Sequence, residues 1–287
     1  MNAIFKKEFR SYFHNMIGPV FMAVLLFFMG IYFIVYNIYN GYPYFAISLS
    51  GVSVVFLFLV PILTMRSFAE EKRTKTDQML LTSRLSVTQI VLGKFFAMDA
   101  IFGICMLAAC IGPLAMKLYG GGALLPDYLA ILMFFLLGSA YISIGMFLSS
   151  LTESQVLAAV GTFAVLLVLQ LVDGLAGMVS SSSLLSLIVL LILVVLVALL
   201  IYGMTKNVFL ADGIGMIGAI ALIIVYAIKK SLFEGIVADL LGAISLAKRF
   251  DTVLEQILDP AVIVLYISVT ALFVFLTVQA VQKRRWS

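Results

Sequence analysis

The sequence predicts an all-α polytopic membrane protein, and three observations carry this prediction. The mean hydropathy is +1.20, 64% of the residues are hydrophobic and only 11% are charged, whereas soluble domains usually carry about 25% charged residues. The apolar stretches are continuous and about 20 residues long, which is the length that a transmembrane helix needs. The strands of a membrane β-barrel would instead alternate over segments of about ten residues.

Residues 1–15 are expected to form an amphipathic helix ahead of the first transmembrane helix. At 100° per residue, its aromatic side chains fall within one arc and its basic side chains fall opposite them. Aromatic residues facing basic ones are typical of a helix that lies in the lipid headgroup layer. A helical extension of the first transmembrane helix is the alternative. The aromatic arc consists of Phe5, Phe9, Tyr12 and Phe13, and the basic arc of Lys6, Lys7, Arg10 and His14.

Eight transmembrane helices are expected, although 213–228 is short and its full crossing stays open. Their ranges are 17–36, 45–65, 95–116, 128–150, 155–176, 184–204, 213–228 and 261–281. The chain divides accordingly into 16–65 (helices one and two), 66–92 (a polar loop), 93–183 (helices three to five), 184–228 (a pair), 229–260 (two short amphipathic helices at the outer surface) and 261–287 (the last helix and a basic tail).

Basic residues predict the orientation of these helices. Eight crossings place both termini on one side, together with 13 of the 18 Lys and Arg residues. The positive-inside rule assigns that side to the cytoplasm. The net charge of +4 therefore indicates topology, and no nucleic-acid partner is expected.

Several kinds of site are excluded by motif. The chain has no G-x-x-x-x-G-K-[ST] phosphate loop and a single histidine, so we expect no nucleotide site, no metal site and no catalytic residues. Asp99 and Asp173 are expected near the ends of their helices, which argues against proton-coupled transport. Small residues in the fourth helix, between Gly138 and Ser149, predict close helix packing more than a substrate path.

The polar island, residues 65–94, holds nine of the 32 charged residues. So many charges cannot cross a bilayer, so the island is expected to be a cytoplasmic loop. A short helix is expected from Thr76, with Asp77 in its first turn and an apolar tip at 79–81. Such a helix suits docking onto a cytoplasmic partner. Ser86 and Thr152 are expected to cap the helices that follow them, in Ser-Val-Thr-Gln and Thr-Glu-Ser-Gln sequences.

The island also carries a family resemblance. The stretch PILTMRSFAEEKRTKTDQMLLTSRLSVTQIVLGKFFA, from Pro61 to Ala97, resembles the signature of ABC-2 type permeases: a late proline, an E-E/R-K pair, T-[DE]-x-[LM]-L-L and V-x-G-K. The similarity continues in GMFLSSLTESQ (145–155) and in FLTVQAVQKRRWS (275–287), and the latter resembles the gliding-motility-associated branch. Lys75 departs from a glycine common in this signature, and Arg84 departs from a proline.

The resemblance implies a type V exporter-like core of six transmembrane helices, with 184–228 as an inserted pair. It implies a transport subunit, not an enzyme, in the bacterial cytoplasmic membrane. ATP and Mg would be bound by two copies of a separate ABC ATPase, and the chain would pair with an identical or sister permease. An accessory extracytoplasmic protein is compatible with this assembly. Residues 1–15 would be the elbow helix, and export is the commoner direction.

The resemblance further implies that the loop 66–92 holds a coupling helix on which the ATPase docks. The substrate and its binding residues are not indicated. The expected docking residues are Phe68, Glu70, Glu71, Lys72, Thr76, Asp77, Gln78, Met79, Leu80, Leu81 and Thr82.

Two other classes of protein remain open at this stage. One is a secondary transporter or channel that works alone, and the other is a membrane scaffold or membrane enzyme. Co-purification of an ATPase with the chain would separate both from the ABC permease.

Overall fold

The computed structural model describes residues 2–76, 86–118, 122–178, 226, 245–251 and 259–286, and every regular element in these ranges is a helix. The chain forms two compact units, Met1–Val168 with Leu246–Ser287, and Leu169–Ser245. Most of the second unit lies outside the described residues, as do the predicted transmembrane helices 184–204 and 213–228. The expected eight crossings therefore stay a prediction.

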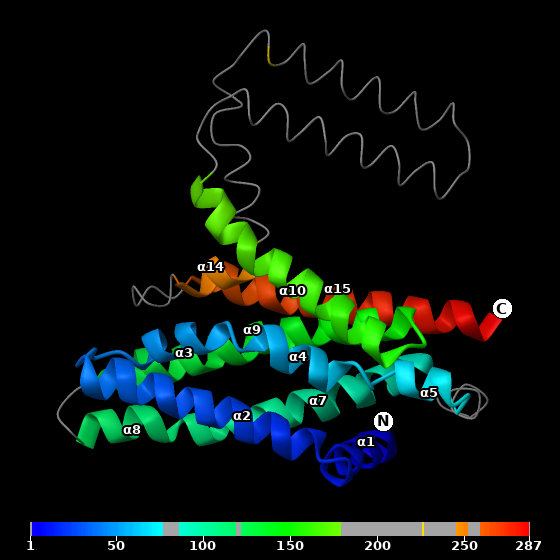
Figure 1. Cartoon of the computed structure of the whole chain (residues 1–287), viewed down its shortest axis with the longest axis horizontal. Helices are drawn as coiled ribbons and strands as arrows, with labels where there is room; N and C mark the ends of the chain where they lie inside the picture. Colours follow the sequence, from blue (N-terminus) through cyan, green and yellow to red (C-terminus); the bar gives the residue numbers. More distant parts are fainter. Residues whose placement is uncertain are drawn as a thin grey trace. The chain divides into compact units, whose positions relative to one another are not determined.

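The first unit is a bundle of long helices (Figure 1). Four helices are long and apolar enough to cross a membrane, and a fifth candidate is a pair bent by 62°. The protein is therefore a multi-pass membrane protein, as predicted. The helices are α1 (Asn2–His14), α2 (Ile17–Tyr32), the π-helix η1 (Phe33–Tyr39), α3 (Phe45–Ser53), α4 (Phe56–Thr64), α5 (Ala69–Arg73), α7 (Val87–Ala109), α8 (Ile111–Leu118), α9 (Leu124–Leu151), α10 (Gln155–Met178), α14 (Leu246–Asp251) and α15 (Pro260–Trp286).

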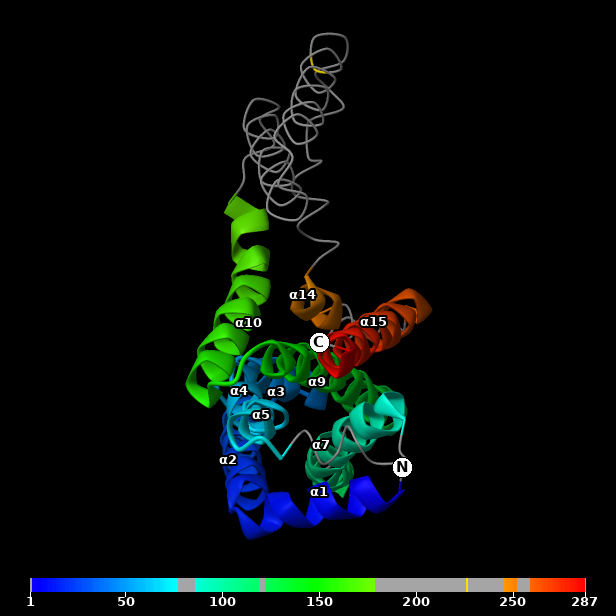
Figure 2. The same ribbon diagram turned by 90° about the vertical axis from the view of Figure 1, so that its right-hand side faces the viewer.

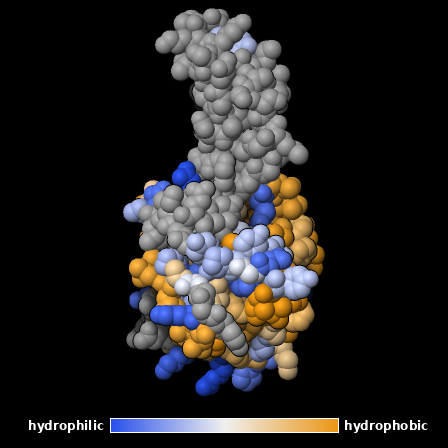
Figure 3. Space-filling view, turned by 90° about the vertical axis from the view of Figure 1, so that its left-hand side faces the viewer, coloured by the Kyte–Doolittle hydropathy of each residue, from blue (hydrophilic) through white to orange (hydrophobic). Residues whose placement is uncertain are grey.

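Helix α9 is the centre of the first unit and packs on α3, α4, α7 and α15. Its glycines permit this close packing, as predicted. A Cβ atom on Gly138 would lie 2.3 Å from the ring of Phe102, and one on Gly145 would lie 2.4 Å from Thr64 Oγ1. Large apolar side chains on other helices, such as Phe27 and Leu107, are exposed and suited to lipid contact. Figure 3 shows hydrophobic residues in orange on the flanks of the molecule.

Both chain termini, α5 and the turn between α9 and α10 lie at one end of the first unit, which we call the terminal end (Figure 1). Helix α1 lies across this end: it is seen nearly end-on in Figure 1 and along its length in Figure 2. An amphipathic helix in this position can lie flat in a headgroup layer.

Side-chain hydrogen bonds near the terminal end show how α7 and α10 are capped at their N-termini. Ser86 Oγ accepts a hydrogen bond from Gln89 N at 3.3 Å, which confirms the expected cap and starts α7 at Val87. The expected cap at Thr152 is wrong. Ser154 Oγ instead accepts from Leu157 N at 3.4 Å, while Thr152 Oγ1 accepts from Ser154 N. The short turn leaves Ser154 adjacent to the first helical residue, where a cap must be.

Helix α14 is the described part of the segment 229–260. Its Leu246 and Phe250 lie one turn apart and are both buried. The Phe250 ring lies 5.5 Å from that of Phe134 on α9, and Tyr266 on α15 donates a hydrogen bond to Leu246 O at 2.8 Å. The apolar face of α14 is therefore covered by protein. The remainder of the two expected amphipathic helices lies outside the described residues.

Candidate functional site

The described part of the polar island is built around the short helix α5. It has five residues, Ala69–Arg73, and isolated helices shorter than about 12 residues are marginal in water. Contacts with other helices must therefore hold it in place. The helix expected to begin at Thr76 is not tested, because 77–85 lie outside the described residues. Thr76 itself follows α5 in a turn.

A side chain from α9 caps the N-terminus of α5. Ser149 Oγ accepts hydrogen bonds from Phe68 N and Ala69 N, both at 3.2 Å, and donates to Met65 O at 3.1 Å. Ser149 is fully buried. The first N–H groups of a helix have no partner within the helix, so α9 supplies the cap that the local sequence lacks.

Substituting Ser149 with alanine is expected to lower the free energy of unfolding by about 1–2 kcal/mol, because two buried N–H groups lose their acceptor. Thermal unfolding of the purified protein measures this. Ser150→Ala is the matched control, since Ser150 Oγ donates to Phe147 O within its own helix. Equal effects of the two substitutions would contradict the capping role of Ser149.

The C-terminus of α5 closes with a Schellman motif. Thr76 N donates to Glu71 O at 3.0 Å and Lys75 N donates to Lys72 O at 3.2 Å. The motif requires a left-handed residue just past the C-cap, and glycine usually occupies that position. Here Lys75 occupies it, with φ +57°. Lys75, which stands where the ABC-2 signature commonly has glycine, is therefore at the one position of this motif where the backbone conformation favours glycine.

Lys75→Gly is expected to stabilise the protein by up to about 1 kcal/mol. A residue with a Cβ atom pays a free-energy cost in the left-handed conformation, and glycine removes this cost. The gain exceeds, by about this amount, the loss that comes from the greater conformational entropy of glycine in the unfolded chain. Lys75→Ala keeps the Cβ atom and should give no such gain. Thermal unfolding of both variants tests this, and a gain with alanine as large as that with glycine would show that the lysine charge, not the backbone, is responsible.

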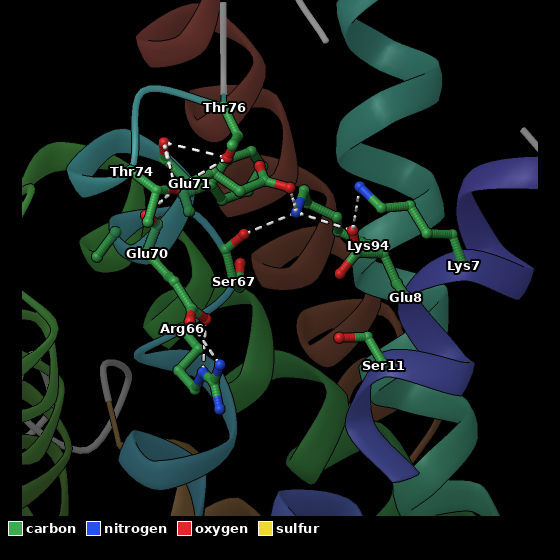
Figure 4. Close-up of polar contacts among 12 residues, drawn as sticks. Lys7, Glu8, Ser11, Arg66, Ser67, Glu70, Glu71, Thr74, Thr76 and Lys94 are labelled. Carbon is green, nitrogen blue, oxygen red and sulfur yellow. Dashed lines mark hydrogen bonds and ion pairs between the residues drawn. The ribbon is translucent and has the colours of Figure 1, made fainter. Parts of the chain in front are cut away.

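The Lys94 cluster, which we define as Glu8, Ser67, Phe68, Glu71 and Lys94, lies beside α5 (Figure 4). Lys94 Nζ lies 2.8 Å from a Glu71 carboxylate oxygen and 3.2 Å from one of Glu8. It also donates to Ser67 O at 2.8 Å and lies 5.1 Å from the centre of the Phe68 ring. Its side chain is only 2% exposed. A charge so deeply buried needs this full set of partners.

The cluster joins elements that are distant in the sequence. Glu8 comes from α1, Glu71 from α5 and Lys94 from α7. A further link runs to α9, because Lys72 Nζ donates to Ser150 O. Within the island, Arg66 and Glu70 pair through two hydrogen bonds of 2.5 Å. Helix α5 is thus tied to α1, α7 and α9 at once.

Helix α1 has three faces, where the sequence predicted two. The phenylalanines stack in a row, with ring centres 5.8 Å apart for Phe5 and Phe9 and 5.0 Å apart for Phe9 and Phe13. Tyr12 does not lie with them as expected: it is buried and donates to Leu63 O at 3.2 Å. Burial raises the pKa of its hydroxyl, which keeps it a neutral donor. Glu8 shares this inner face.

Sequence reasoning missed three residues of this site: Glu8, Lys94 and Ser149. Glu8 is the only acidic residue among the first 15, where four basic residues stand. Lys94 is an isolated cation that begins an apolar run. The isolated positions of Glu8 and Lys94 in the sequence are typical of buried ion pairs, but the sequence does not show which residue each one pairs with. Ser149 carried no signal beyond its place in the row of small residues.

The island's described residues divide into two sets. Phe68, Glu70, Glu71 and Lys72 all make the contacts within the protein given above. Thr76, by contrast, is exposed, as are 73–75. The docking residues 77–82 lie outside the described residues. Among the described residues, no group of three or more His, Cys, Asp or Glu could hold a metal ion.

These features define a multi-pass α-helical membrane protein in which a short charged helix, α5, follows the second membrane segment and is bonded to neighbouring helices. A family model described as ABC-2 family transporter protein matches residues 2–181, which is more than half of the chain. The chain therefore belongs to the ABC-2 transporter family and is an ABC transporter permease. The resemblance noted in the island is confirmed at this level. No curated protein and no solved structure matches the chain significantly.

Proposed function

We propose that the chain is the permease subunit of an ABC exporter and that a separate ATPase docks on its loop 66–92. The observation that carries this proposal is the position of α5. A short helix next to the docking segment is bonded to α1, α7 and α9 through Glu8, Lys94 and Ser149. A displacement of the loop would therefore move three membrane elements together.

The exposure of the residues suggests which part of the loop is attached to the membrane helices and which part contacts the ATPase. Glu71 and Phe68 belong to the Lys94 cluster and serve as the attachment of the loop to the membrane helices. Residues 73–76 are exposed and continue into 77–82, which we propose as the surface that enters the ATPase. The apolar tip Met79–Leu81 would fill a groove on that partner, and the flanking charges would meet its rim.

The assembly would contain two ATPase subunits, which bind ATP and Mg, and a second permease chain that is identical or a sister copy. Its location would be the bacterial cytoplasmic membrane, and the chain would belong with the gliding-motility-associated branch of the family that its last segment resembles. The terminal end would face the cytoplasm, because it carries α1, α5 and the basic C-terminal tail. Residues 1–15, with the row Phe5, Phe9 and Phe13, would rest in the headgroup layer.

Co-purification tests this proposal. The tagged full-length chain is expressed in its native host and isolated from membranes in a mild detergent. We expect an ABC ATPase, identified by mass spectrometry through its phosphate-loop and signature peptides, in about equal amount to the permease. An untagged strain is the control. Failure to recover any ABC ATPase, even after chemical crosslinking through the lysines of the island, would refute the proposal.

A further inference from the structure

A cavity of about 630 Å³ lies between α7, α9 and α15 in the first unit. It runs along the helices, from Thr88 and Gln282 near the terminal end to Asp99 and Ile267 further along the bundle. Its walls are largely aromatic and aliphatic, with rings from Phe95, Phe96, Phe135 and Phe275. This cavity is separate from the Lys94 cluster and plays no part in the proposed docking.

Asp99 is the only ionisable residue among the described residues that line the cavity. Ser139 Oγ lies 2.5 Å from Asp99 Oδ1 and can donate a hydrogen bond to it. None of the ion pairs formed by described residues involves Asp99. The carboxylate therefore has a hydroxyl partner and no basic partner on the described part of the chain.

The structure gives the distance of Asp99 from the start of its helix. The third transmembrane segment was expected at 95–116, with Asp99 near its start and with a helical extension that opens at the Ser86 cap. Helix α7 begins at Val87, so Asp99 lies about 18 Å from its start and ~7.5 Å beyond Lys94. The cap at Ser86 therefore opens an extension of about two turns ahead of residue 95, as expected. A carboxylate in hydrocarbon is costly, by roughly 2.5–3.5 kcal/mol at the bilayer centre, and usually has a function.

We propose that this cavity is a binding site for a lipophilic cation, meaning a molecule with one positive charge and bulky apolar groups. Asp99 supplies the counter-ion, and Ser139 holds the carboxylate in place. The apolar walls bury the hydrocarbon groups, and aromatic rings add attraction for a desolvated cation. The zwitterionic headgroup of a phospholipid fits less well, because its phosphate would meet the Asp99 carboxylate and no basic residue lines the described cavity to pair with it.

The proposal deepens the proposed transport function by naming a ligand class for one site. It is tested on the permease alone, without an ATPase, so its failure and the failure of the docking proposal can be told apart. The full-length chain is reconstituted in nanodiscs of phosphatidylcholine. Binding of radiolabelled tetraphenylphosphonium is measured by equilibrium dialysis, against empty nanodiscs as the background.

We expect saturable binding that Asp99→Asn weakens at least tenfold, because asparagine keeps the shape and the bond to Ser139 but removes the charge. Tetraphenylborate has nearly the same size but the opposite charge. Its affinity for the wild-type protein should be no higher than its affinity for the Asp99→Asn variant. Glu153→Gln, in the exposed turn between α9 and α10, is the matched control and should leave both affinities unchanged.

A second variant guards against a folding defect in Asp99→Asn. Ala271 lines the cavity from α15, and Ala271→Phe should abolish phosphonium binding by filling the space while leaving Asp99 intact. The proposal is overturned if wild type shows no saturable phosphonium binding, if Asp99→Asn binds it as tightly as wild type, or if Ala271→Phe does.

Discussion

Replacing Lys94 with methionine should lower the free energy of unfolding by about 3–5 kcal/mol, which is the usual cost of removing one partner from a buried ion pair. Methionine keeps the length of the side chain but leaves Glu8 and Glu71 as partly buried carboxylates without their cation, 12% and 16% exposed. It also removes the donor to Ser67 O. Thermal unfolding of the purified protein, followed by circular dichroism, measures the loss.

Lys7→Met is the matched control for this substitution. Lys7 lies 4.0 Å from the same Glu8 carboxylate, but its side chain is 63% exposed, and exposed ion pairs contribute little. Adding Glu8→Gln and Glu71→Gln to the Lys94→Met variant should restore part of the stability, because no buried charge then lacks a partner. If Lys94→Met unfolds at the wild-type temperature, the Lys94 cluster does not hold α5 in place.

Leu80→Asp should reduce the permease-stimulated ATPase activity at least tenfold while the protein still inserts into the membrane. Leu80 is the middle residue of the expected apolar tip, and a carboxylate placed in an apolar groove loses its hydration without a partner. The measurement is ATP hydrolysis by the reconstituted complex, together with the amount of permease in washed membranes.

Leu125→Asp provides the comparison for this second substitution. Leu125 is exposed in the first turn of α9, away from the terminal end, where an acidic residue suits the helix dipole. It should leave ATP hydrolysis near the wild-type rate. Unchanged coupling in Leu80→Asp would remove the apolar tip from the docking assignment.

The sequence was sufficient for the membrane class and for the long helices of the first unit. Long apolar runs ended by polar turns placed the described spans within a few residues. The start of α7 at Val87 is the one that the Ser86 cap predicted for the extension of the third membrane helix. The motif around Pro61–Ala97 predicted the family, and the family match confirms it.

The sequence was not sufficient for contacts between distant segments. Glu8 and Lys94 are 86 positions apart, and helical periodicity shows which residues share a face but not what the face meets. Tyr12 illustrates this: its angle lies at the edge of the aromatic arc, about 20° beyond Phe5, and only the neighbouring carbonyl of Leu63 shows that it belongs to the inner face. The helix α5 was missed because its cap, Ser149, belongs to another helix.

The most direct test of the central claim is a residue-specific crosslink between the island and the ATPase. A photo-reactive benzoylphenylalanine is placed at Thr76, which is exposed next to the docking segment, in cells of the native host. Tyr39, at the end of η1 and 87% exposed, is the control position at the opposite end of the first unit. The account predicts that Thr76 crosslinks to an ABC ATPase and that Tyr39 does not. Absence of the ATPase from the Thr76 products, or its equal capture at Tyr39, would contradict docking on this loop.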